Sequence, residues 1–231
     1  MSTATFDPVK RSPGHRQHAA LGARFTREAD WDVPADYGSV DEERQAVTEG
    51  VAVADATARG KVDLRGDLAP VIASLTGRRA LETGAVLAKG TQDGGFHLAL
   101  ISSRWALALC RPDSLERCLA HAEEAAAGGD AMATDVTSLY AGFALFGPGA
   151  VGVLSRLTAF DAGRLDEGAC AATRVAEIPA ILARPAVGGS PFELYVGSEY
   201  GRYAWEAILE AGAPLGIRPV GWEALRAEGW W

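Results

Sequence analysis

The stretch Val62-Asp-Leu-Arg-Gly-Asp-Leu-Ala-Pro-Val-Ile-Ala-Ser-Leu-Thr76 alternates in the manner of a strand, turns at Gly66, and continues with apolar residues at helical spacing. A looser copy of it follows as Phe143-Ala-Leu-Phe-Gly-Pro-Gly-Ala-Val-Gly-Val-Leu-Ser-Arg-Leu-Thr158, with its turn at Gly147. The sequence therefore predicts two strand–turn–helix segments built on one pattern.

Each copy is followed by elements of the same kind. Trp105–Leu109 predicts a strand before a helix over 114–127, and Phe192–Val196 predicts a strand before a helix over 201–211. The duplication indicates an α+β fold of two ferredoxin-like, split βαβ units in a pseudo-symmetric arrangement. We expect a flexible arm over 1–14, a first subdomain over 15–133 and a second over 134–231, with a cleft between the copies that favours a ligand.

The composition argues against several classes of protein. A net charge of -8 argues against a nucleic-acid surface, which needs clustered basic residues. No apolar run is long enough to span a membrane, and the N-terminus lacks the apolar core of a signal peptide, so we expect a cytoplasmic protein. Cys110, Cys118 and Cys170 include no close pair suited to a metal, and we expect them to be buried thiols.

Five short motifs occur in a set order along the chain. They are Leu-Gly-Ala-Arg-Phe25, Asp55-Ala-Thr-Ala-Arg-Gly-Lys61, Ala144-Leu-Phe-Gly-Pro148, Phe192-Glu-Leu-Tyr-Val196 and Gly216-Ile-Arg-Pro-Val-Gly221. Over residues 19–228 the chain thereby resembles the glycine-cleavage T-protein, a folate-dependent aminomethyltransferase, and the related folate domains of dimethylglycine dehydrogenase and sarcosine oxidase. The resemblance implies the T-protein folate-binding-domain type of fold, in which three subdomains form a cloverleaf around a tetrahydrofolate channel.

The resemblance also implies where the channel residues fall. The family places a catalytic carboxylate after a Gly-Gly hairpin, and the matching positions here hold Leu98 and Ala99, which cannot take a proton. A family Asn falls near Arg111, an aromatic residue falls near Ala186, and a basic residue of the last motif falls at Trp222.

Glu193 is the family-type residue that survives. It matches the glutamate that bonds the pterin ring, because two carboxylate oxygens can accept from the ring N–H and the amino group together. The alternative is that Glu193 is only the outward residue of an alternating strand. His97 neighbours the lost carboxylate and could titrate in its place, although a lone His in an apolar run favours packing in the core. Asp93 fits the chemistry of a hairpin turn.

Two other patterns predict no site. Gly147-Pro148-Gly149 opens a helix, but Pro148 removes an N–H donor and no phosphate-loop Lys follows, so it is a packing turn. His15 and His18 stand three residues apart near Asp30 and Asp32, without a second ligand cluster downstream, so we expect a solvated helix and no metal.

Three hypotheses about function follow. The first is a subunit with a degenerate folate site, which binds tetrahydrofolate weakly without its partner. That partner would be a flavin amine dehydrogenase or oxidase, or a separate chain that supplies the C-terminal β-barrel expected from the family. The second is a tetrahydrofolate-dependent aminomethyl or methyl transferase of one-carbon metabolism that is active on its own. The third is a folate-independent enzyme on the same scaffold, because fold alone does not determine chemistry.

Overall fold

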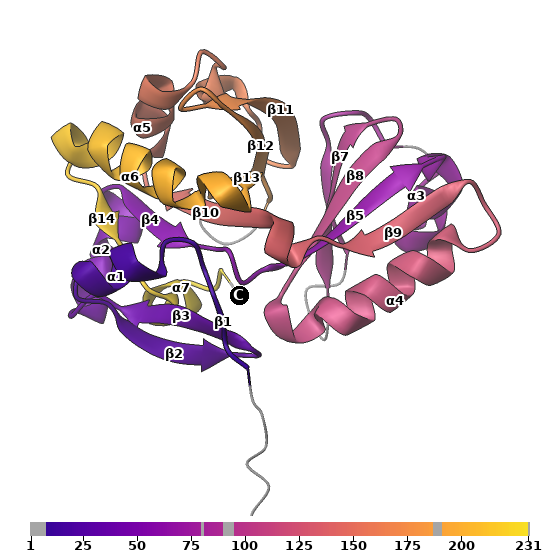
Figure 1. The fold of residues 1–231 in the computed structure, drawn as a ribbon. Helices are drawn as coiled ribbons and strands as arrows, with labels where there is room; N and C mark the ends of the chain where they lie inside the picture. Colours follow the sequence, from indigo (N-terminus) through magenta and orange to yellow (C-terminus); the bar gives the residue numbers. More distant parts are fainter. Residues whose placement is uncertain (1–7, 80, 90–94, 187–190, 231) are drawn as a thin grey trace, which may run out of the picture.

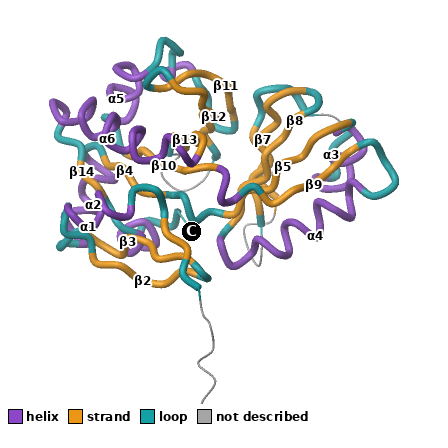
Figure 2. Tube along the Cα trace, in the orientation of Figure 1, coloured by secondary structure: helices purple, strands orange, loops and turns teal. Residues whose placement is uncertain are grey.

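The computed structural model describes residues 8–79, 81–89, 95–186 and 191–230, which form an α+β fold with three sheets. Two large sheets lie side by side, and Figure 1 shows one on each side of the molecule with its own helices. Figure 2 shows helices beside both large sheets. Within the described ranges, no helix is long and apolar enough to cross a membrane.

The five-stranded sheet has the order β6-β7-β8-β5-β9. Its elements are β5 (Gly60–Gly66), α3 (Leu68–Thr76), β6 (Val86–Lys89), β7 (Phe96–Ser102), β8 (Trp105–Cys110), α4 (Leu115–Ala126) and β9 (Ala131–Asp135). Helices α3 and α4 cover one face of the sheet, where Val62, Leu64 and Leu98 pack in an apolar core. A short 3-10 turn over Pro112–Ser114 leads into α4.

The six-stranded sheet has the order β11-β12-β13-β10-β4-β14. Its strands are β4 (Ala52–Asp55), β10 (Tyr140–Phe146), β11 (Ala169–Val175), β12 (Ile178–Arg184), β13 (Phe192–Gly197) and β14 (Arg218–Pro219). Its helices are α2 (Val40–Glu49), α5 (Ala150–Leu157), α6 (Gly201–Gly212) and α7 (Trp222–Ala227). Phe143 and Trp205 belong to the core under α5 and α6, whereas Phe146 and Trp230 belong to a smaller core beside α2.

A third, small sheet comes from the start of the chain. It has the order β1-β3-β2, with β1 (Lys10–Arg11), β2 (Arg24–Glu28) and β3 (Trp31–Asp36), and α1 (His15–Ala20) lies between β1 and β2 in the sequence. Gly221 fits closely against this sheet, because a Cβ there would lie 2.1 Å from the Ala35 carbonyl oxygen. The small sheet therefore packs beside the six-stranded one, through the segment that begins α7.

The strand orders correct the predicted division of the chain. The boundary predicted between residues 133 and 134 falls inside β9. Strand β4, which precedes the first unit in the sequence, pairs with β10 of the second sheet. In the first unit β9 lies beside β5, as in a split βαβ unit, but in the second unit β4 takes the corresponding place beside β10. The six-stranded sheet therefore includes a strand from the N-terminal part of the chain, and no single boundary in the sequence separates the two sheets.

The hairpin between β11 and β12 turns at two residues with positive φ, and a proline lies inside its second strand. The two-residue turn is Ala176-Glu177, with φ of 47° and 64°, and Pro179 lies within β12. Pro179 is tolerated because it pairs with Arg174 on β11, whereas the pairing with β13 begins only at Ala180. The turn predicted at Asp93 lies outside the described residues.

Candidate functional site

The strand β13 points Glu193 and Tyr195 to one face of the six-stranded sheet. Phe192 and Leu194 point to the opposite face and pack in the core under α5 and α6. Glu193 and Tyr195 instead face the five-stranded sheet, where Tyr195 packs with Leu107 of β8. Both Glu193 and Tyr195 are fully buried, with an exposed fraction of 0%. The alternation of the strand therefore places a carboxylate and a phenol together between the two large sheets.

Both carboxylate oxygens of Glu193 have a partner from this chain. The Nη1 of Arg59 donates to Oε1 of Glu193, and the hydroxyl of Tyr195 donates to Oε2 over 2.7 Å. The Arg59 side chain is only 6% exposed. Burial, and next the charge of Glu193, raises the pKa of Tyr195 well above its ordinary value, so the hydroxyl keeps its proton. The carboxylate is therefore neutralised and hydrogen-bonded from within the protein.

Arg59 has two further neighbours. Its Nη2 lies 3.3 Å from Nδ1 of His97, and its guanidinium carbon lies 5.5 Å from the ring centroid of Trp230. Burial, and next the charge of Arg59, lowers the pKa of His97 to about 3. A histidine with this pKa is neutral near pH 7 and a weak base, so it accepts a hydrogen bond from Arg59. His97 therefore does not replace the missing carboxylate as a proton acceptor.

The register of β7 separates the two positions where the family carboxylate was sought. Leu98 is fully buried in the core under α3 and α4. Ala99 points the other way and packs against Ala183 of β12, at the contact between the two large sheets. Ala183 in turn pairs with Glu193 across the ladder of β12 and β13. The position that faces the second sheet therefore carries only a methyl group.

The other predicted site residues have different surroundings. Arg111 is 56% exposed and forms an ion pair with Asp113 over 3.0 Å. Ala186 is exposed at a bend after β12. Trp222 is buried with Trp31 of the small sheet and donates through Nε1 to the Asp55 carbonyl over 3.0 Å. Arg111, Ala186 and Trp222 therefore do not join the cluster around Glu193.

Sequence reasoning missed Arg59 and Tyr195 as site residues. Tyr195 had a signal, because it stands two residues after Glu193 in an alternating strand and so shares its face. Arg59 had none, because it lies 134 residues from Glu193 along the chain. Lys61 was missed too: it is fully buried, and its Nζ donates to the carbonyls of Thr57, Arg59 and Thr137 over 2.7, 2.8 and 3.2 Å.

The histidine pair near the N-terminus is not solvated as predicted. His18 is fully buried, with Nε2 2.7 Å from Oδ2 of Asp55 and Nδ1 2.8 Å from the Tyr37 hydroxyl. His15 instead contacts Asp32 over 3.1 Å. Among the described residues, no group of three or more ligating side chains could hold a metal ion. The two histidines therefore serve separate structural contacts.

The arrangement around Glu193 does not fit a pterin as it stands. A pterin would have to donate to carboxylate oxygens that are fully buried and already bonded to Arg59 and Tyr195. The matching position for a proton acceptor is Ala99. The chemistry of the cluster is therefore that of a closed, internally neutralised ion pair.

Comparisons with known proteins point to one family. The sequence profile of the GCVT N-terminal domain matches residues 14–230. The aminomethyltransferase of Streptomyces avermitilis is 34% identical over 215 residues, which cover 88% of this chain and 58% of that protein. The aminomethyltransferase of Geobacillus kaustophilus is 29% identical over 228 residues, covering 92% of this chain and 61% of the relative. The chain thus spans about three fifths of the length of these relatives.

Solved structures agree on the fold. The glycine cleavage system aminomethyltransferase T from Bartonella henselae superposes with a TM-score of 0.81 at 18% identity, over 94% of this chain and 60% of that chain. One chain of the heterotetrameric sarcosine oxidase from Corynebacterium sp. U-96 superposes with a TM-score of 0.66 at 16% identity. That match covers 90% of this chain and 97% of the other.

Proposed function

This chain belongs to the GCVT N-terminal domain family, and from that premise we propose that it works as a subunit with a degenerate folate site. In this proposal it does not transfer one-carbon units by itself. The pseudo-symmetric pairing of two ferredoxin-like units, supported by the strand order of the five-stranded sheet, is its scaffold.

The observation that carries the proposal is the bond between Arg59 and Glu193. A guanidinium offers planar N–H donors to a carboxylate, which is the donor pattern that the amino group and ring N–H of a pterin would offer. Trp230 lies over the Arg59 guanidinium, where an aromatic ring could also cover a flat ligand. Arg59 thus satisfies Glu193 in the way that the ligand would, and tetrahydrofolate must displace a buried ion pair to bind.

The cluster also lacks a residue that could act as the general acid or base in one-carbon transfer. General acid–base help contributes about two to four orders of magnitude in rate. Ala99 cannot provide it, and His97, with a pKa of about 3, is too weak a base near neutral pH. The cluster supports binding or packing better than proton transfer.

The proposed partner is a second chain that completes the assembly. One chain of the heterotetrameric sarcosine oxidase is matched over 97% of its length. We therefore propose a flavin-dependent amine dehydrogenase or oxidase, or a separately encoded C-terminal barrel, as the partner. Affinity purification at native expression level from the source organism tests this. A stoichiometric partner that carries flavin or a barrel domain supports the proposal, and a monomer without such a partner contradicts it.

A second candidate is a tetrahydrofolate-dependent aminomethyltransferase that acts on its own. The 34% identity to the aminomethyltransferase of Streptomyces avermitilis favours it. This function requires Arg59 to leave Glu193 when folate binds. Calorimetry with tetrahydrofolate separates the two candidates, because the transferase needs binding that depends on Glu193 and the degenerate subunit does not.

A further inference from the structure

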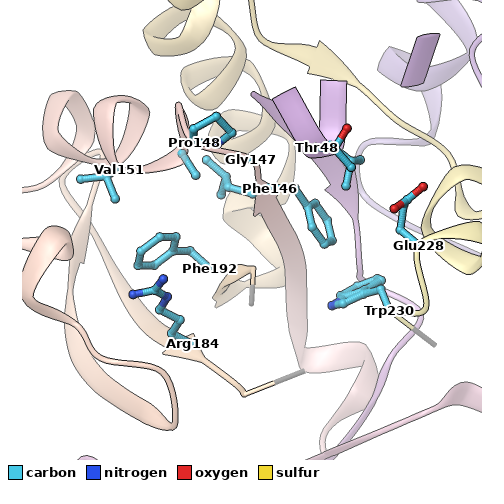
Figure 3. A pocket seen from close by; sticks show the side chains of 12 residues that line it. Thr48, Phe146, Gly147, Pro148, Val151, Arg184, Phe192, Glu228 and Trp230 are labelled. Carbon is cyan, nitrogen blue, oxygen red and sulfur yellow. The ribbon is translucent and has the colours of Figure 1, made fainter. Parts of the chain in front are cut away.

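A hollow lies at the end of the six-stranded sheet, beside Trp230, which also contacts Arg59. It is a cavity of about 510 Å³, within the range of about 300–1,000 Å³ that is usual for small-molecule sites. The end of β12, the start of β13 and the first turn of α5 form one side, and the end of β10, α2 and the segment after α7 form the other. Figure 3 shows Arg184 and Phe192 on one side of this hollow, across from Phe146 and Trp230.

The aromatic side chains that line the cavity suit a flat, apolar part of a ligand. Phe146 and Trp230 pack edge to face, with ring centroids 5.3 Å apart. Phe192 stands opposite, together with the aliphatic side chain of Val151 from α5. Aromatic surfaces of this kind hold planar rings by stacking and by the burial of apolar area. The cavity therefore selects for an aromatic ligand rather than for a sugar or a bare ion.

One end of the cavity carries an incompletely satisfied cation. The guanidinium of Arg184 lies 4.9 Å from the Phe192 ring centroid, and its Nη1 donates to the Leu165 carbonyl over 3.0 Å. Its Nε is buried and has no hydrogen-bond partner among the described residues. The nearest carboxylate oxygen paired with it is that of Glu167, 3.8 Å from Nη2 and on an exposed side chain. A ligand carboxylate at this end would therefore give the guanidinium a closer anionic partner than Glu167.

The other charged group in the lining does not oppose an anion at this end. Glu228 stands on the far side of the cavity with Trp230, and its Oε1 accepts from Nε of Arg44 over 2.8 Å. The charge of Glu228 is therefore neutralised by Arg44, whereas the carboxylate of Glu167 lies farther from Arg184. A ligand with a negative group at the Arg184 end and rings toward Trp230 matches both halves of the site.

We propose that this cavity binds a small aromatic carboxylate of one or two rings, with its carboxylate on Arg184 and its rings between Phe192 and Trp230. The cavity shares Trp230 with the Arg59–Glu193 cluster, but its lining includes neither Arg59 nor Glu193, so this inference does not depend on the proposed function. The ligand's carboxylate would pair with the guanidinium of Arg184, which lines the cavity and has the Glu167 carboxylate 3.8 Å away.

The test is isothermal titration calorimetry of the full chain with 2-naphthoate, beside its uncharged analogue naphthalene-2-carboxamide. We expect saturable binding of one naphthoate per chain and at least about tenfold weaker binding of the amide, because a charge-assisted hydrogen bond is lost. Arg184→Gln should weaken naphthoate binding by at least about tenfold. The matched control Arg164→Gln removes a side chain that is 87% exposed and lies outside the cavity, and it should leave the affinity unchanged.

Three results would overturn the proposal. The first is no saturable binding up to the solubility limit of naphthoate. The second is equal affinity for the acid and the amide, which compares two ligands on the unaltered protein and so does not depend on how a variant folds. The third is a folded Arg184→Gln variant that binds naphthoate as the parent does.

Discussion

Arg59 is bonded to Glu193 at a point where the first side chain is 6% exposed and the second is not exposed at all. The two residues come from segments far apart in the sequence, one just before β5 and one in β13. The pair therefore ties the five-stranded sheet to the six-stranded one. The same contact occupies the carboxylate on which the family resemblance places a pterin. A pterin could bind Glu193 only by displacing Arg59 from a contact that stabilises the fold.

The first prediction concerns this ion pair. Arg59→Met and Glu193→Gln should each lower the free energy of unfolding by about 3–5 kcal/mol, because each breaks a buried ion pair. The double variant should lose less than the two singles together, with a coupling of about 1–3 kcal/mol. Urea denaturation followed by circular dichroism measures these values. The exposed pair Arg164 and Asp161 provides the control, and its coupling should stay below about 1 kcal/mol. Additive losses at Arg59 and Glu193 would contradict the structure.

The second prediction concerns the phenol that shares the carboxylate. Tyr195→Phe removes the donor to Oε2 of Glu193 and should lower the free energy of unfolding by about 1.5–3 kcal/mol, the range for a hydrogen bond to a charged group. Tyr203→Phe is the matched control, because Tyr203 is 50% exposed on α6. Chemical denaturation of both variants is the measurement. Equal stability of the two would mean that the bond at Tyr195 contributes nothing.

The third prediction is a pH dependence from His97. Its pKa is about 3 in the folded chain and 6.5 for an ordinary histidine, so between these values the unfolded chain binds more protons. Stability should therefore fall as the pH falls from about 6.5 toward 3. His97→Gln should flatten this slope, whereas replacement of the exposed His121 by Gln should not. Thermal denaturation across this pH window checks it, and an unchanged slope in His97→Gln would refute the assignment.

The fourth prediction concerns Lys61, which links the start of β5 to the turn before β10. Lys61→Met should lower the free energy of unfolding by at least about 2 kcal/mol, because the carbonyls of Thr57, Arg59 and Thr137 lose a common donor. Lys10→Met, at a side chain that is 44% exposed, serves as the control. If denaturation midpoints of the two variants coincide, the buried ammonium has no structural role.

The sequence allowed most elements of the two large sheets to be predicted, because alternation and helical spacing are local properties. It did not allow the division of the sheets to be predicted, since β4 pairs with β10 through a contact that no local pattern encodes. Local pattern also does not show that β12 continues through Pro179, which is tolerated because this residue pairs on one side only.

The candidate site, like the fold, could be predicted from the sequence only in part. The resemblance singled out Glu193, but Tyr195 was missed, although the alternation of the strand places it on the same face. Whether Leu98 or Ala99 faces the second sheet depends on the register of β7, which only the three-dimensional structure gives. The neutralisation of Glu193 by Arg59 depends on the docking of two sheets, and no local sequence pattern predicts it.

The most direct test of the account is isothermal titration calorimetry of the purified chain with tetrahydrofolate, with Glu193→Gln measured in parallel. The account predicts no binding, or binding weaker than about 1 mM, since the ligand must displace Arg59 from a buried carboxylate. Tight binding to the parent chain that disappears in a folded Glu193→Gln variant would contradict it. That result would establish Glu193 as an available ligand for folate and favour a transferase that acts on its own.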